Sequence, residues 1–350
     1  MKKRGIDYFL IVLILVMTVL IIGCLYFDVF GFKKSRVQQN KLISGKEFEI
    51  QGVTWRTISY YYYPGIYKDI YSHKSNRRLL KKAKKIGANY LLVRAFYSGT
   101  KDGGLIGNDF EAQKYLKNAI NAAHKQGFGI LLVPYVESRD YWNGKWKLSE
   151  KIWTETVIKW AKFAQENKVE MFAPGVEMNL ILDENIAGEW LKSILPQIRD
   201  VYQGKVVTAE LFDIERWKIL DKAGAFKGYD CIGLTFFPRK EYDGVSDIRS
   251  FEDYREYVEK EAEIIDMLSN KYHIPCKLAV PMGLDYWQGS QQHQPVPDAS
   301  IVAQALDQGL DILKKYNFTG VFISHWASEP DHFGKKDDVE KMLQSRWSKE

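Results

Sequence analysis

The chain has 350 residues, of which 46% are hydrophobic and 27% charged, the balance of an ordinary globular protein rather than a disordered one. Its formal net charge is +6, and residues 1–46 account for all of it, with eight Lys and Arg side chains against two Asp. The rest of the chain is close to neutral. It therefore lacks the broad basic surface of a nucleic-acid-binding protein, and we expect no nucleic-acid partner.

The N-terminal region reads as a membrane anchor. After a short tail over residues 1–7, an apolar stretch runs from Tyr8 to Phe27, long enough to cross a bilayer as a helix. We predict a transmembrane signal anchor over residues 8–30 with the lipid bilayer as its partner, then a linker over residues 31–46. Basic residues flank both sides of the span, and the short tail before a large domain favours a cell-membrane protein whose C-terminal domain is extracytoplasmic. A lipoprotein attached through Cys24, in a lipobox-like Ile21-Ile22-Gly23-Cys24, is the disfavoured alternative, because apolar residues follow it.

Residues 47–350 alternate strand-like and helix-like segments. The predicted strands are Phe48–Trp55, Asn89–Phe96, Phe128–Tyr135, Val169–Val176, Lys205–Leu211, Cys231–Phe236, Cys276–Pro281 and Gly320–His325. The predicted helices are Ser75–Ile86, Phe110–Lys125, Ser149–Asn167, Ile186–Tyr202, Glu215–Ala223, Phe251–Tyr272, Ser300–Lys315 and Asp337–Trp347, the first two closed by Gly87 and Gly127.

Eight strand–helix pairs in about 300 residues predict an α/β fold, a (β/α)8 TIM barrel preceded by the transmembrane helix. A doubly wound open sheet is the alternative, but no Gly-x-Gly-x-x-Gly follows the first strand.

The cysteines and histidines carry little chemistry. Cys231 and Cys276 begin two strands that would be neighbours, where buried free thiols are favoured over a disulfide. The six histidines are scattered, and no Cys/His cluster has the spacing of a metal site. We expect no metal and no other cofactor.

The ends of the predicted strands are rich in carboxylates and aromatic side chains. In a TIM barrel these ends build the active site, and Glu177 stands at the end of the fourth strand as the best candidate for a functional carboxylate. Sugar rings stack on aromatic faces, and glycosidic cleavage needs a pair of carboxyl groups, so the set favours a carbohydrate ligand. The buried-strand residue Arg94 should need a carboxylate partner, whether catalytic or structural.

Three segments are similar to those of a known family. The sequences Phe172-Ala173-Pro174-Gly175-Val176-Glu177, Ile198-Arg199-Asp200-Val201-Tyr202 and Tyr229-Asp230-Cys231-Ile232-Gly233 resemble glycoside hydrolase family 113. This family of clan A contains retaining (β/α)8 enzymes that include β-mannanases. By this resemblance Glu177 matches the general acid/base and Trp326 an aromatic platform for the sugar.

The same comparison reveals a departure at the seventh strand. The family carries its nucleophile there in Glu-x-Gly, whereas this chain has Pro281-Met282-Gly283, and proline cannot form a glycosyl-enzyme intermediate. Asp285 is the first substitute, followed by Glu329 and Glu210. The predicted substrate-binding residues are Trp55, Arg94, Tyr97, Asn179, Phe236, Trp287 and Trp326.

The sequence therefore predicts a membrane-anchored glycoside hydrolase that cleaves β-glycosidic bonds of an oligo- or polysaccharide, mannan-like by resemblance. A catalytically inactive glycan-binding or cell-envelope protein is the alternative, because Pro281 replaces the nucleophile. A purely structural envelope protein, with an occluded barrel mouth, is a weaker third hypothesis.

Overall fold

The computed structural model describes residues 47–55, 64–136, 146–211, 216–236, 250–284, 299–324 and 337–348. All of them belong to one compact unit, Gly45–Glu350. The predicted anchor over residues 8–30 lies outside the described residues. Among those that are described, no helix has both the length and the apolar content needed to cross a membrane.

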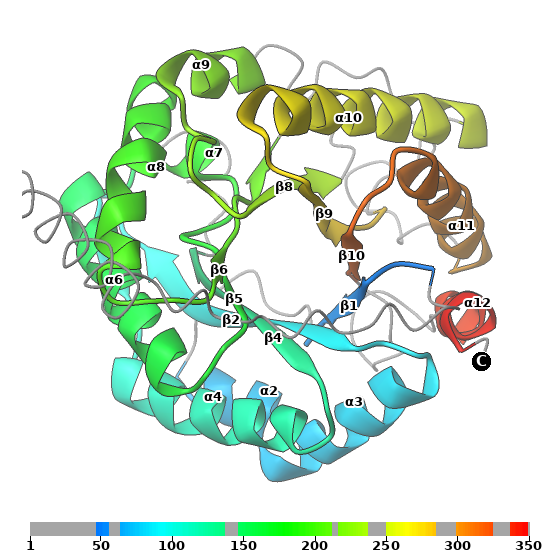
Figure 1. The fold of residues 1–350 in the computed structure, drawn as a ribbon. Helices are drawn as coiled ribbons and strands as arrows, with labels where there is room; N and C mark the ends of the chain where they lie inside the picture. The colour runs from blue at the N-terminus through cyan, green and yellow to red at the C-terminus, as the bar shows by residue number, and fades with distance from the viewer. Residues whose placement is uncertain are drawn as a thin grey trace, which may run out of the picture. The chain divides into compact units, whose positions relative to one another are not determined.

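The described unit is a parallel β-barrel surrounded by helices (Figure 1). Its strands are β1 Ile50–Thr54, β2 Tyr90–Gly99, β4 Gly129–Val136, β5 Met171–Phe172, β6 Lys205–Val206, β7 Glu210–Leu211, β8 Cys231–Phe236, β9 Cys276–Met282 and β10 Gly320–Ile323. They are hydrogen-bonded in the order β6-β5-β4-β2-β1-β10-β9-β8-β7, and a two-residue β3, Leu105–Ile106, pairs antiparallel with β2. The predicted (β/α)8 barrel is confirmed.

The helices form the outer layer. They are α2 Ile66–Tyr71, α3 His73–Lys85, α4 Asp109–His124, α6 Glu150–Glu166, α7 Met178–Ile181, α8 Glu184–Arg199, α9 Arg216–Ala223, α10 Phe251–Tyr272, α11 Ala299–Lys315 and α12 Asp337–Trp347. Gly87 and Gly127 follow α3 and α4 with φ of 83° and 81°, the left-handed backbone that the predicted helix ends require. The short α2 and α7 were not predicted, because neither is long enough to show a helical apolar period.

The barrel closes through the fifth predicted strand, which is split. Its first part, β6, pairs with β5, and its second part, β7, pairs with β8. Between them, Val207 bridges Cys231 at the start of β8. One strand thus joins the two ends of the sheet, and its break moves it from one neighbour to the other.

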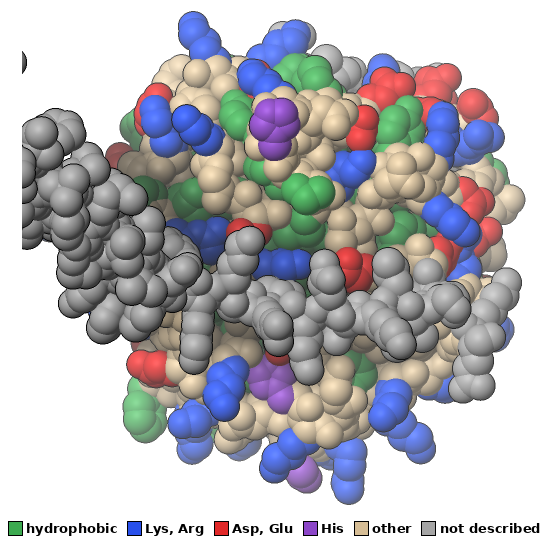
Figure 2. All heavy atoms as spheres, in the orientation of Figure 1, with side chains coloured by type: hydrophobic (Ala, Val, Ile, Leu, Met, Phe, Trp, Pro, Cys, Tyr) green, Lys and Arg blue, Asp and Glu red, His purple; other side chains and the backbone are tan. Residues whose placement is uncertain are grey.

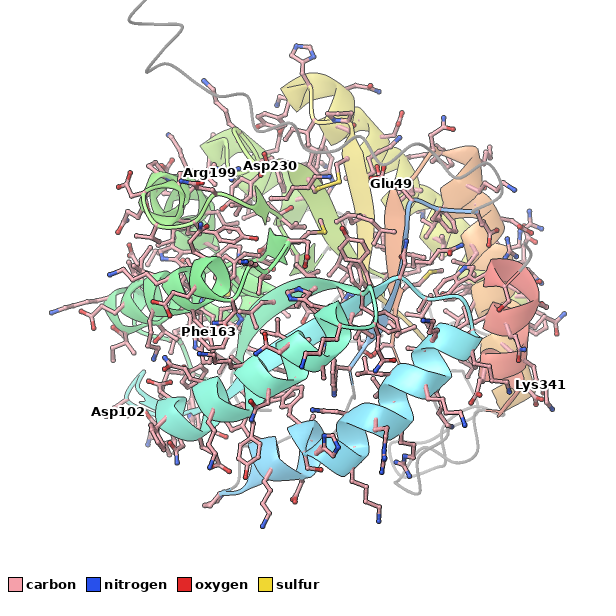
Figure 3. The ribbon with its side chains drawn as sticks, turned by 60° about the horizontal axis from the view of Figure 1, so that its bottom comes forward. Glu49, Asp102, Phe163, Arg199, Asp230 and Lys341 are labelled. Carbon is pink, nitrogen blue, oxygen red and sulfur yellow. A yellow bond between two sulfur atoms is a disulfide. The ribbon has the colours of Figure 1, made fainter. Side chains whose placement is uncertain are left out.

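An ion pair between Arg199 and Asp230 stabilises the N-terminal end of this split strand, here called the lower end of the barrel. Arg199, at the end of α8, donates from one guanidinium nitrogen to the carbonyl of Gly204 at 2.9 Å and from the other to Asp230, which precedes β8. Asp230 also accepts the N–H of Val206 at 2.7 Å. Figure 3 shows Arg199 and Asp230 side by side. The pair therefore links a helix and two strands at the end opposite the candidate site.

The buried apolar residues form two groups. One lines the barrel interior and includes Leu92, Val133, Ala209 and Phe322, and the other fills the space between sheet and helices. Alternation along β2 separates them, because Leu92 faces inward while Leu91 and Val93 belong to the outer group. By this alternation Arg94 faces the interior.

The surface carries charges of both signs. In Figure 2, Lys and Arg side chains are interspersed with Asp and Glu over the face shown. This distribution accords with the near-neutral composition of the domain.

The expectation of free thiols is wrong, since Cys231 and Cys276 form a disulfide. These residues pair directly across β8 and β9, and their Cα atoms lie 4.5 Å apart. The sequence predicts that the two strands are neighbours but does not determine the register between them. That register places the two side chains directly opposite each other.

We expect the disulfide to stabilise the barrel by about 2–4 kcal/mol, because it cross-links positions 45 residues apart in the unfolded chain. A thiol assay of the denatured, unreduced protein should find at most one free thiol, that of Cys24. Reduction should lower the unfolding temperature of the wild type and leave that of a Cys231→Ala/Cys276→Ala variant unchanged. Three free thiols without reductant would contradict this.

Candidate active site

Glu177 occupies a strained turn at the end of β5. Only Met171 and Phe172 form strand, and Pro174 cannot donate a hydrogen bond to the ladder. A Cβ on Gly175 would lie 2.3 Å from the sulfur of Met178, so the turn is closely packed there. Glu177 then adopts a left-handed backbone, with φ 54° and ψ 43°. Such a conformation is uncommon for a residue other than glycine and concentrates at functional sites.

The surrounding backbone holds this turn in place. The N–H of Glu177 donates to the carbonyl of Ala209 at 2.8 Å, and its carbonyl accepts the N–H of Leu180 at 2.9 Å as α7 begins. The Glu177 residue is 1% exposed. The hydrogen bond to Ala209 fixes Glu177 to the split strand, immediately before β7.

Glu210, the first residue of β7, is the described carboxylate that interacts with Glu177. It is completely buried, and its Oε2 accepts the backbone N–H of Asn179 at 3.3 Å. Its Oε1 is also buried and has no hydrogen-bond partner within the described ranges. Glu210 therefore holds the first turn of α7, directly after Glu177.

Burial raises the pKa of Glu210 to about 8. The N–H groups of Asn179 and Met178 lower that pKa, and the neighbouring charge of Glu177 raises it further. A buried carboxyl group that interacts with a second carboxylate is a common feature of active sites.

Arg94 lies on β2, beyond the level at which β1 ends. Its guanidinium carbon is 4.5 Å from the centre of the Tyr135 ring on β4, and the residue is 8% exposed. Its backbone is fixed from outside the barrel, since Tyr71 donates to the Arg94 carbonyl at 3.0 Å and accepts its N–H at 3.1 Å. The carboxylate partner expected for Arg94 is not found among the described residues, and a cation–π contact takes its place.

Three predicted substrate-binding residues pack in the outer core instead of gathering with Glu177. Trp55 packs against Tyr71 of α2, with ring centroids 5.7 Å apart. Tyr97 donates to Asp109 at 2.5 Å and accepts from Trp160 at 2.6 Å. Phe236 packs edge-on against Phe318 at 5.9 Å. In β2, Tyr97 points away from the interior because it is an odd number of residues from Arg94.

Asn179 and the end of the seventh strand are described in the structure, whereas the remaining predicted site residues are not. Asn179 is buried in α7, where its backbone binds Glu210. Pro281 and Met282 lie in β9, so the seventh strand ends in apolar side chains. Four residues lie outside the described ranges: Asp285, Trp287, Trp326 and Glu329.

The fold brings two further residues into the site. Glu210 is predicted as a second carboxylate only after Asp285 and Glu329, and Tyr135 is not among the predicted substrate-binding residues. Alternation along β4 could have identified Tyr135, because Leu131 and Val133 face inward and Arg94 pairs with Val133.

No group of three or more His, Cys, Asp or Glu side chains in the described parts of the chain is arranged to hold a metal ion.

The fold matches those of known glycosidases. A β-1,4-mannanase of glycoside hydrolase family 113 aligns with a TM-score of 0.63 at 14% identity, covering 87% of this chain and 99% of the mannanase chain. The β-mannanase AaManA from Alicyclobacillus acidocaldarius, in complex with ManMIm, gives 0.59 at 14% identity, covering 87% and 97%. A β-glucuronidase from an uncultured Clostridium gives 0.56 at 14% identity, covering 87% of this chain and 50% of that one.

No protein-family profile matches the sequence, and no curated protein matches it. The three structural matches, each at 14% identity, show that the chain shares its barrel fold with these glycosidases. The structure thus has the barrel fold of the family 113 mannanases that the sequence resembles.

The raised pKa of Glu210 predicts a pH-dependent stability. Between pH 4.5 and about pH 8, Glu210 is ionised in the unfolded chain and protonated in the folded protein, so folding takes up a proton. Its stabilising contribution is complete below pH 4.5 and is lost as pH rises through 8. We expect Glu210→Gln, which cannot ionise, to exceed the wild type in stability at pH 9 by roughly 1–3 kcal/mol, and to show no such gain at pH 4.

Thermal unfolding across pH 4–9 measures this difference. Glu166→Gln, at an exposed position on α6, is the matched control and should follow the wild type. Parallel curves for wild type and Glu210→Gln would show that Glu210 is ionised throughout this range.

Proposed function

We propose that this protein is a membrane-anchored glycoside hydrolase that cleaves β-glycosidic bonds of a polysaccharide, mannan-like by resemblance, with Glu177 as general acid/base. The main support is the position of Glu177, which is held after β5 in a left-handed turn. The barrel that carries it has the fold of known β-mannanases. In this role Glu177 protonates the departing oxygen and then deprotonates the incoming water.

The second carboxylate in this proposal is Asp285. Pro281 cannot serve, and Glu210 is engaged with the backbone of α7. Asp285 follows β9 by three residues, and Glu329 follows β10. A short side chain on a loop suits the wider carboxyl separation of inverting enzymes, roughly 6.5–9.5 Å, better than the roughly 5–5.5 Å of retaining ones.

The glycan-binding residues proposed with them are Arg94, Asn179, Trp287 and Trp326. Trp and Tyr rings stack on sugar faces, so the two tryptophans after β9 and β10 supply the platforms. The neighbours include a mannanase and a β-glucuronidase, so both neutral and acidic glycans belong among the substrates to test.

The proposed location is the cell membrane, with residues 8–30 as the single span and the barrel on the extracytoplasmic side. The Cys231–Cys276 disulfide supports this location, because disulfides persist in oxidising compartments. Attachment through a lipidated Cys24 is the alternative means of anchoring.

A second candidate function is glycan binding without cleavage. The apolar end of β9, with Pro281 in place of the family's nucleophile, favours it. This candidate predicts oligosaccharide binding without new reducing ends during long incubation.

Glu177→Gln should reduce hydrolysis of a β-1,4-mannan by about 100-fold or more, because it removes proton transfer to the leaving group. Release of reducing ends measures the rate, and circular dichroism checks the fold. Glu166→Gln should retain wild-type activity. Full activity in Glu177→Gln would reject the acid/base role, and the absence of cleavage in the wild type, with binding retained, would favour the second function.

Asp285→Asn should also strongly reduce hydrolysis. The first product formed by the wild type should carry the inverted anomeric configuration, read by proton NMR. Glu329→Gln is the companion variant. A retained configuration, or loss of activity in Glu329→Gln alone, would remove Asp285 from the mechanism.

A further inference from the structure

Arg94 is a buried cation that faces the interior of the barrel near its mouth. It stands two residues after Leu92, which lines the interior, and its register partner on β4 is Val133, another interior residue. The pairing of β1 with β2 ends at Leu92, so Arg94 lies above that level, on the side where the strands end. Its guanidinium group stacks on the ring of Tyr135.

No acidic side chain among the described residues forms an ion pair with Arg94. Its Nε is buried without a hydrogen-bond partner in the same set of residues. The stacked ring of Tyr135 attracts the cation but cannot accept the in-plane N–H bonds of the guanidinium group. A cation that is nine-tenths buried without an acceptor destabilises a fold, so its presence calls for an explanation.

The residues at the described strand ends explain why no described carboxylate pairs with Arg94. The two described carboxylates, Glu177 and Glu210, lie at β5 and β7, and β4 separates β5 from β2 in the sheet. The end of β9 contributes Pro281 and Met282, which are apolar and buried. None of these strand ends supplies Arg94 with a negative charge.

We propose that Arg94, backed by Tyr135, binds an anionic group of the glycan, either a carboxylate or a phosphate. The guanidinium fork matches the two oxygens of either group. The ring of Tyr135 lies 4.5 Å from the guanidinium carbon and does not accept the in-plane N–H donors of the fork. The substrate class is then an acidic polysaccharide. The assignment rests on the proposed function only in that a glycan enters the barrel mouth.

Matched ligands test the proposal on the full-length chain in detergent, in a Glu177→Gln background that prevents turnover. The first pair is a β-1,4-linked mannuronic acid hexamer and β-1,4-mannohexaose, which differ in the C6 carboxylate. The second pair is methyl β-mannoside 6-phosphate and methyl β-mannoside. Calorimetry should show an affinity at least about tenfold higher for the anionic member of one pair, and the pair identifies the anion as a uronate or a phosphate.

Two substitutions of Arg94 separate charge from geometry. Arg94→Met should abolish the preference for the anionic ligand, and Arg94→Lys should restore part of it, because lysine keeps the charge but lacks the planar fork. Arg77→Met, at an exposed position on α3, should leave the preference intact.

Stability gives a readout independent of any ligand. Because Arg94 has no counter-charge in the described structure, Arg94→Met should unfold at the same or a higher temperature than its parent. A fall of more than a few degrees would mean that a carboxylate pairs with Arg94, and would overturn the proposal.

The remaining outcomes distinguish this inference from the proposed function. Equal binding of neutral and anionic ligands, failure to bind either anionic ligand, or an anionic preference that survives Arg94→Met would overturn the inference. Glu177-dependent cleavage of neutral mannan would leave the proposed function standing in those cases. Arg94-dependent anion binding without cleavage would support the inference and reject hydrolysis.

Discussion

The arrangement of the candidate site depends on how the barrel closes. The strand between Lys205 and Leu211 pairs with β5 at its start and with β8 at its end. The split strand passes close to β8. A Cβ on Gly233 would lie 2.2 Å from the carbonyl oxygen of Thr208, so glycine is needed there. Thr208 adds a side-chain hydrogen bond from the N–H of Gly233 at 3.1 Å. The break in the strand thereby determines where Ala209 and Glu210 stand.

Those two residues in turn fix the candidate acid. Ala209 holds the backbone of Glu177, and Glu210 holds the N–H of Asn179 in the next turn. The left-handed turn at Glu177 is thus stabilised from both sides, and the cost is a fully buried carboxyl group with a raised pKa. Carboxylates whose pKa is perturbed by burial cluster at functional sites.

The two ends of the barrel carry different parts of the family resemblance. Arg199 and Asp230, within the resembling segments, form a structural link at the lower end, whereas Glu177 belongs to the upper end, where β/α barrels carry out chemistry. At that end the chain departs from the family at Pro281. Among the described residues, β9 ends in apolar side chains and Arg94 has no carboxylate partner, and both observations support the proposed anionic ligand.

The sequence by itself determined the order of strands and helices and the position of Glu177 at a strand end, because apolar periodicity and glycine helix ends are local properties. It did not determine the register across β8 and β9, which joins Cys231 to Cys276, or the break that places Glu210 beside Glu177. Nor did it show that Trp55, Tyr97 and Phe236 turn to the outer core while Tyr135 turns inward. Each of these depends on which face of a closed sheet a side chain takes and which strand lies beside it, and only the tertiary structure decides that.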